Sequence, residues 1–202
     1  MCMEKTPWEK TVEFHGHSCI GLAMGFRAAE AAMKFLEHER DVDEEMLAIV
    51  ENDSCAVDAI QVVTGCTLGK GNLLFRDYGK QAYTFALREK KKAVRITVQG
   101  PEEDSLREIT KLRGKVACKE ATEEEQALFK SKTGEIISTY LSRPLEEVCE
   151  IREVDCEIPG KARLFSSVTC SCCGEKVMEP RARVKDGKIT CIPCAEHYTR
   201  GW

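Results

Sequence analysis

Two pairs of cysteines near the end of the chain constrain its folding more than any other feature. Cys170 and Cys173 form one CxxC pair, Cys191 and Cys194 form a second, and seventeen residues separate the pairs. Four thiolates at this spacing are typical of a tetrahedral structural zinc site. So short a segment cannot bury enough apolar surface to fold alone, so the metal would be its core. Cys172, inside the first pair, is expected to point away from the zinc.

The residues around these pairs predict a treble-clef zinc finger. The segment between the pairs contains a turn signal at Asp186-Gly187 and suits a short β-hairpin. Cys194 is then expected to begin a short helix that ends at Trp202. A zinc knuckle, a hairpin and a helix follow one another in this order in treble-clef fingers.

The remainder of the chain is long enough for one further domain. Pro159-Gly160 interrupts a predicted strand, and we place the domain boundary near Ser166. The expected division is a core domain over residues 1–165 and a zinc-finger domain over residues 166–202. No apolar run approaches a membrane span, and no signal-peptide core is visible, so we expect a cytoplasmic protein. Its twelve cysteines are then read as metal ligands or reactive thiols.

Apolar periodicity predicts a mixed α/β or α+β sandwich for the core. Between Ile20 and Leu36 the apolar residues recur at spacings of three and four, which marks a helix with Ser18 as its candidate N-cap. The other predicted elements are a strand over 46–51, a helix over 55–63 ended by Gly65, strands over 83–88 and 93–99, a charged helical region from 101, a helix over 123–141 and a strand over 148–158.

Three core cysteines have positions that suggest chemistry. Cys19 and Cys55 each follow a serine at a predicted helix N-terminus, where free N–H groups and the helix dipole favour a thiolate. Cys66 follows the second of these helices. A straight helix would separate Cys55 from Cys66 by roughly 15 Å, although a loop after Gly65 could fold Cys66 back. A single site that uses both is therefore a hypothesis.

Neighbouring polar residues extend this candidate site. His15 and His17 alternate around Gly16, so an extended segment would direct both to one face, and the nearby Cys19 favours His17 as a metal ligand. Asp58 lies three residues after Cys55 on the same helical face, where it either orients a ligand or makes an ordinary polar contact. The metal ligands expected in the core are His17, Cys19, Cys55 and Cys66, with Cys19 and Asp58 as candidate catalytic residues. A mixed His/Cys set favours zinc or iron over magnesium or calcium.

Three motifs resemble those of the FmdE family, named for the E subunit of formylmethanofuran dehydrogenase. They are His15-Gly16-His17-x-Cys19-x-Gly21 and the segments 53–61 (DSCAVDAIQ) and 64–73 (TGCTLGKGNL). The resemblance implies a thioredoxin-like α+β core with a five-stranded mixed sheet, a metal-binding active site in that core, and a treble-clef tail in the longer members. Ile20 departs from the pattern, because proline is expected between Cys19 and Gly21.

The resemblance favours an accessory metal-binding protein linked to redox metabolism, with molybdenum or tungsten enzyme subunits as partners and a homodimer as the assembly. The alternative is a free-standing metal- or thiol-dependent enzyme that acts on an unidentified small molecule. A nucleic-acid-binding regulator is the weakest reading, since the net charge is −4 and the basic residues of the finger form a modest patch. These basic residues are Arg181, Arg183, Lys185 and Lys188.

Overall fold

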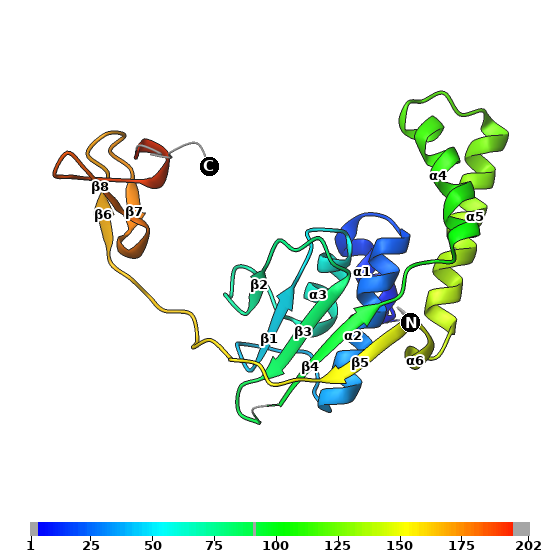
Figure 1. Ribbon diagram of the computed structural model, residues 1–202, viewed down its shortest axis with the longest axis horizontal. Coiled ribbons are helices and arrows are strands. Elements are labelled where there is room, and N and C mark those ends of the chain that lie inside the picture. Colours follow the sequence, from blue (N-terminus) through cyan, green and yellow to red (C-terminus); the bar gives the residue numbers. More distant parts are fainter. Residues whose placement is uncertain (1–3, 91, 196–202) are drawn as a thin grey trace. The chain divides into compact units, whose positions relative to one another are not determined.

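The computed structural model describes residues 4–90 and 92–195 and divides the chain into two compact units (Figure 1). The first unit ends at Lys161 and the second begins at Ala162, a few residues before Ser166, where the sequence alone placed the division. No helix in the described part of the chain is both long enough and apolar enough to cross a membrane.

The first unit contains six helices and five strands in the described ranges. In chain order they are α1 (Pro7–His15), α2 (Ile20–Leu36), β1 (Met46–Val50), α3 (Ala56–Thr64), β2 (Leu73–Phe75), β3 (Ala82–Leu87), β4 (Lys92–Val98), α4 (Glu103–Ala117), α5 (Glu123–Ser142), α6 (Leu145–Val148) and β5 (Cys149–Glu153). Each helix and strand predicted for the core is present. The sequence interpretation omitted α1, β2 and the short helix α6, and it overextended β5.

The strands form one mixed sheet, in the order β2-β1-β3-β4-β5. β1 and β2 are parallel, and the other three pairings are antiparallel. Every residue of β1 and of β3 is buried, which explains why both strands are almost continuous apolar runs in the sequence. The five-stranded mixed sheet with flanking helices confirms the predicted α+β class.

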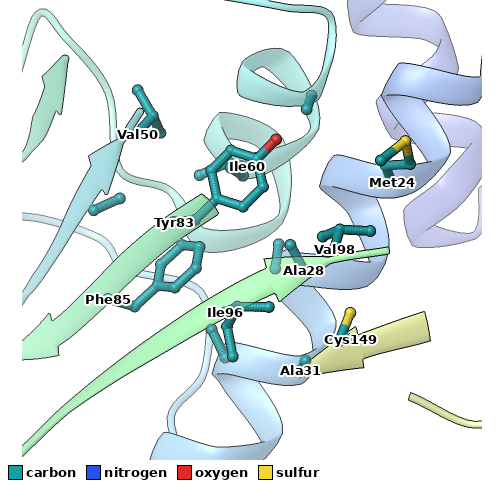
Figure 2. Packing of buried hydrophobic residues seen from close by; sticks show 14 of the residues in the cluster. Met24, Ala28, Ala31, Val50, Ile60, Tyr83, Phe85, Ile96, Val98 and Cys149 are labelled. Atoms are coloured by element: carbon teal, nitrogen blue, oxygen red, sulfur yellow. The ribbon is translucent and has the colours of Figure 1, made fainter. Parts of the chain in front are cut away.

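Helix α2 lies at the centre of the core. Ten of the seventeen residues of α2 are buried, because most of its surface is apolar, whereas Arg27, Glu30 and Lys34 form its polar side. Figure 2 shows Ala28 and Ala31 of this helix facing Ile96 and Val98 of β4 and Cys149 of β5. Small side chains on α2 thus allow its backbone to lie close to the sheet.

A close backbone contact joins α2 to α3. A methyl group added at Gly25 would lie 2.2 Å from the carbonyl oxygen of Ala56. Only glycine therefore permits this crossing, which lies close to the N-terminal ends of both helices. The contact aligns the first turns of α2 and α3 side by side.

Helices α4 and α5 form a hairpin that joins the core through the last turns of α5. Ile137 and Tyr140 are buried in the main apolar cluster, and the hydroxyl of Tyr140 donates a hydrogen bond to the carbonyl oxygen of Gln99. Helix α5 begins with a capping box in which Thr122 and Glu125 satisfy each other's backbone N–H groups. A similar box between Thr6 and Glu9 begins α1.

The described residues of the second unit contain two small hairpins. Strands β6 (Ser167–Thr169) and β7 (Lys176–Met178) form the first, and β8 (Arg183–Lys185) and β9 (Lys188–Thr190) form the second. The predicted turn at Asp186-Gly187 joins β8 to β9. Two short 3₁₀ helices, η1 (Glu179–Arg181) and η2 (Ile192–Cys194), follow β7 and β9. The prediction that Cys194 begins a helix is wrong, because Cys194 ends η2 and Ala195 is extended. The rest of that expected helix, residues 196–202, lies outside the described residues.

We predict that Gly25→Ala destabilises the core, because its new methyl group would overlap the backbone of α3. Overpacking of this kind costs about 1–3 kcal/mol, measured as a lower free energy of unfolding in denaturant titrations followed by circular dichroism. Gly114→Ala in α4 is the matched control, since no atom lies within 4 Å of its added methyl group. The control should gain about 0.5–1 kcal/mol from helix propensity; an equal loss in both variants would contradict the close crossing.

Candidate metal centres

The candidate centre of the core begins with a histidine and an aspartate from different helices. His15 is the last residue of α1, and its Nδ1 lies 2.7 Å from Oδ2 of Asp58 in α3. The side chain of His15 is 12% exposed. A carboxylate on Nδ1 fixes the ring and leaves Nε2 as the atom available to a metal. Nε2 lies 4.0 Å from Sγ of Cys19.

The chain reverses direction between α1 and α2, and this turn gathers three donor atoms. Gly16 adopts the left-handed conformation with φ at 93°, which favours glycine. The rings of His15 and His17 then stand with their centroids 4.6 Å apart. One donor atom each from His15, His17 and Cys19 lies within 4.8 Å of the other two. The extended segment expected around Gly16 is wrong, because His15 ends a helix.

Cys19, rather than Ser18, is the N-cap of α2. Its Sγ accepts a hydrogen bond from the backbone N–H of Leu22 at 3.4 Å. Burial, together with the neighbouring thiol of Cys55, nevertheless raises the pKa of Cys19 above its ordinary value. The helix N-terminus thus favours a thiolate at Cys19, as the sequence predicts, and burial opposes it.

Cys55 lies beside Cys19 because α2 and α3 cross so closely. A methyl group added at Gly21 would be 3.5 Å from Cβ of Cys55. Asn52 holds the turn that precedes Cys55. Its Oδ1 accepts hydrogen bonds from the N–H of Ser54 at 3.1 Å and from the hydroxyl of Ser54 at 2.7 Å. Its amide donates to the carbonyl oxygen of Lys80 at 2.6 Å. Asn52 was not singled out from the sequence, although Asn two residues before Ser signals such a turn.

A cavity of about 460 Å³ opens beside these residues. His15, Cys55 and Asp58 belong to its wall, so the candidate centre is open to a small molecule. The other lining residues are Val50, Asn52, Asp53, Ser54, Val57, Gln61, Leu68, Leu73 and Phe75.

Cys66 lies at the opposite end of α3 from Cys55. Eleven positions of helical rise correspond to roughly 15 Å. The side chain of Cys66 is fully buried and donates to the carbonyl oxygen of Met46 at 3.7 Å. Burial raises the pKa of its thiol to about 12. The donor cluster formed by the described residues does not include Cys66, so its use as a ligand stays a prediction from the sequence.

The motif around Cys66 has a structural role in holding the following loop. The buried amide of Asn72 donates to Oδ2 of Asp41 at 3.0 Å and to the carbonyl oxygen of Met46 at 3.1 Å. Its Oδ1 accepts the backbone N–H of Thr67 at 2.9 Å. These bonds close the loop between α3 and β2 and place Leu68 and Leu73 at the cavity.

The second centre is the cysteine cluster of the finger. Cys170, Cys173, Cys191 and Cys194 place their sulfur atoms within 4.8 Å of one another. Backbone N–H groups, chiefly that of Cys173, lower the pKa of Cys170 to about 6. Neighbouring thiols, Cys191 first, raise the pKa of Cys194. A divalent cation would relieve the repulsion that four thiolates create. The exposed Cys172 is outside this donor group.

A family model described as "FmdE, Molybdenum formylmethanofuran dehydrogenase operon" matches residues 14–150. The chain belongs to the FmdE family. This match runs from the end of α1 to the start of β5 and confirms the resemblance read from the three motifs. A second model, "Prokaryotic dksA/traR C4-type zinc finger", matches residues 163–200, in agreement with four cysteine ligands in the tail.

Two known proteins extend the comparison of this FmdE-family chain. A "Probable S-adenosyl-L-methionine-binding protein" of Archaeoglobus fulgidus is 36% identical over 192 residues, which cover 92% of this chain and 51% of that protein. The chain therefore spans about half the length of this curated relative. The crystal structure of a tungsten formylmethanofuran dehydrogenase FmdE-like protein from Syntrophus aciditrophicus has a TM-score of 0.58 at 23% identity, covering 92% of this chain and 88% of that one. This likeness supports the fold.

We predict that the core loses stability as the pH rises above 9, and that Cys66 contributes to this loss. An unfolded thiol deprotonates near pH 9, whereas the buried Cys66 keeps its proton until about pH 12. Folding is then opposed by about 1.4 kcal/mol per pH unit for this group. Cys66→Ala should show a correspondingly shallower fall between pH 9 and pH 11 in urea titrations. Parallel curves for the two proteins would contradict the buried position.

We predict that a chelator makes the finger sensitive to protease before the core. The second unit has no large apolar core in its described residues, whereas the first contains a five-stranded sheet and buried helices. Limited proteolysis with and without chelator, followed by mass spectrometry, should locate the first cuts after residue 166. Simultaneous digestion of both units would show that the core also depends on its metal.

Proposed function

We propose that this FmdE-family protein binds two metal ions, a structural zinc in the finger and a zinc or iron ion in the core. The core ion would be held by His15, His17 and Cys19. The observation that carries this proposal is the convergence of these three donors beside a carboxylate that orients His15. Four cysteines would hold the finger zinc.

The donor set fits an exchangeable core site better than a closed one. Two imidazoles and one thiolate suit zinc or iron, and three protein ligands leave a coordination position for water or a substrate. Asp58 would act as a positioning residue through His15, because its carboxylate contacts Nδ1 and not the donor atoms. Cys55 stands beside Cys19, where it would be a further ligand or a neighbouring thiol.

The role of this site that we propose is that of an accessory metal protein to a molybdenum or tungsten enzyme. Support comes from the family description, which names a molybdenum formylmethanofuran dehydrogenase operon. The second candidate is a free-standing metal-dependent enzyme, favoured by the cavity that the candidate centre borders. In that case the bound metal would supply Lewis acidity, and His15 and Cys19 would hold it in place.

Metal content of the full-length protein tests the proposal directly. The wild-type protein, loaded with zinc and desalted, should contain two equivalents by mass spectrometry. Cys19→Ser and His15→Gln should each retain only the finger zinc. Cys118→Ser and His38→Gln are matched controls outside both donor clusters and should retain two. Asp58→Asn should weaken the core site about 10–100-fold while leaving the finger unchanged.

The outcomes separate the alternatives. If Cys19→Ser and His15→Gln both retained two equivalents of zinc, the second zinc ion would be bound elsewhere, and the proposed core site would be contradicted. If the core site is confirmed, a search for metal-dependent turnover distinguishes the enzyme from the accessory protein. Turnover that disappears in Cys19→Ser and persists in Cys118→Ser would favour the enzyme.

A further inference from the structure

The cavity beside the core centre has a composition that selects among small molecules. Its wall contains two carboxylates, Asp53 and Asp58, and the described residues that line it include no lysine or arginine. An anionic ligand such as a carboxylate, phosphate or oxoanion would meet repulsion there without a compensating cation.

A bound metal would not reverse this preference. A divalent ion carries two positive charges. A metal-bound thiolate at Cys19 and the carboxylates of Asp53 and Asp58 carry three negative charges near it. The two histidines are neutral when they bind a metal. The loaded site therefore keeps an excess of negative charge toward the cavity.

One side of the cavity is apolar and accessible. Leu68 is 71% exposed and Phe75 is 48% exposed, and both line the cavity with Leu73 and Val57. Covering these side chains with an apolar ligand body would remove their surface from water. The ring of Phe75 could also attract a cation placed over its face.

The acidic and apolar parts occur in one volume of suitable size. The cavity of about 460 Å³ can accept a molecule of the size of an aralkyl amine. Asp53 precedes α3 and Asp58 belongs to its first turn, whereas Leu68 and Phe75 come from the loop and strand that Asn72 holds in place. The polar and apolar walls thus belong to separate, individually fixed segments.

We propose that this cavity binds an organic cation with an apolar body, of the amine class. This inference rests on the proposed function for the metal that would stand beside the ligand, and it deepens that function by naming the ligand class. The carboxylate of Asp53 would pair with the ammonium group, because the carboxylate of Asp58 already contacts His15. The apolar side would cover the body of the molecule.

Three probes of similar shape and different charge test this selectivity. Phenethylamine, 2-phenylethanol and phenylacetate are titrated into the ¹⁵N-labelled full-length protein, in zinc-loaded and metal-free form, and followed by amide chemical shifts. The amine should bind at least about tenfold more tightly than phenylacetate, with the alcohol between them. The largest shifts should fall on residues that line the cavity.

Matched variants separate the contribution of the carboxylate to binding from that of the apolar side chains. Asp53→Asn should weaken the amine about threefold and leave the alcohol unchanged, whereas Asp155→Asn, which removes an equal charge outside the cavity lining, should leave both unchanged. Phe75→Ser should weaken amine and alcohol together. Val42→Ser is its control, since Val42 is 87% exposed and does not line the cavity.

The result that would overturn the proposal is equal or tighter binding of phenylacetate, or shifts that map outside the cavity. Metal content is measured on the same samples, so the two proposals can fail separately. Amine selectivity in a protein that binds no core metal would support the ligand class and contradict the metal site. A protein that binds a core metal but does not distinguish the amine from phenylacetate would support the metal site and contradict the ligand class.

Discussion

The close crossing of α2 and α3 is the contact on which the core centre depends. Gly25 allows the backbone of α3 at Ala56 to approach without a side chain between the helices. Because the crossing lies near the start of both helices, it brings their first residues together. Cys19 and Cys55 are neighbours for this reason. A wider separation would move Asp58 away from His15 and leave the imidazole without its orienting carboxylate.

Sequence periodicity predicted the main helices and strands because each has a strong local pattern. The apolar run of residues 46–50 and the capping of α5 are examples. Helix α1 was omitted although Thr6, Pro7 and Glu9 form a recognisable helix start, since its exposed surface carries little apolar periodicity. As a result His17 was favoured over His15, whose contact with Asp58 spans forty-three positions and has no local signal.

The two candidate centres depend on different physical means of controlling charge. In the finger, backbone N–H groups stabilise a thiolate at Cys170 within a short knuckle. In the core, burial opposes a thiolate at Cys19. The ring of His15 is held in place by the carboxylate of Asp58, which lies on a helix far away in the sequence. The finger cysteines are therefore recognisable from spacing alone. The geometry of the core required the packing of three helices, which no motif encodes by itself.

The three core donors lie within five consecutive residues, which run from the last residue of α1 to the N-cap of α2. An ion held by His15, His17 and Cys19 would close a small ring across this link and restrict the angle between the two helices. A metal ion that binds only the folded state stabilises that state, and the stabilisation increases with the concentration of the ion relative to its dissociation constant. Docking of α1, which otherwise relies on contacts such as that of Trp8 with Phe26, would then vary with metal supply. The ion would therefore stabilise the docked position of α1 in addition to any chemical role.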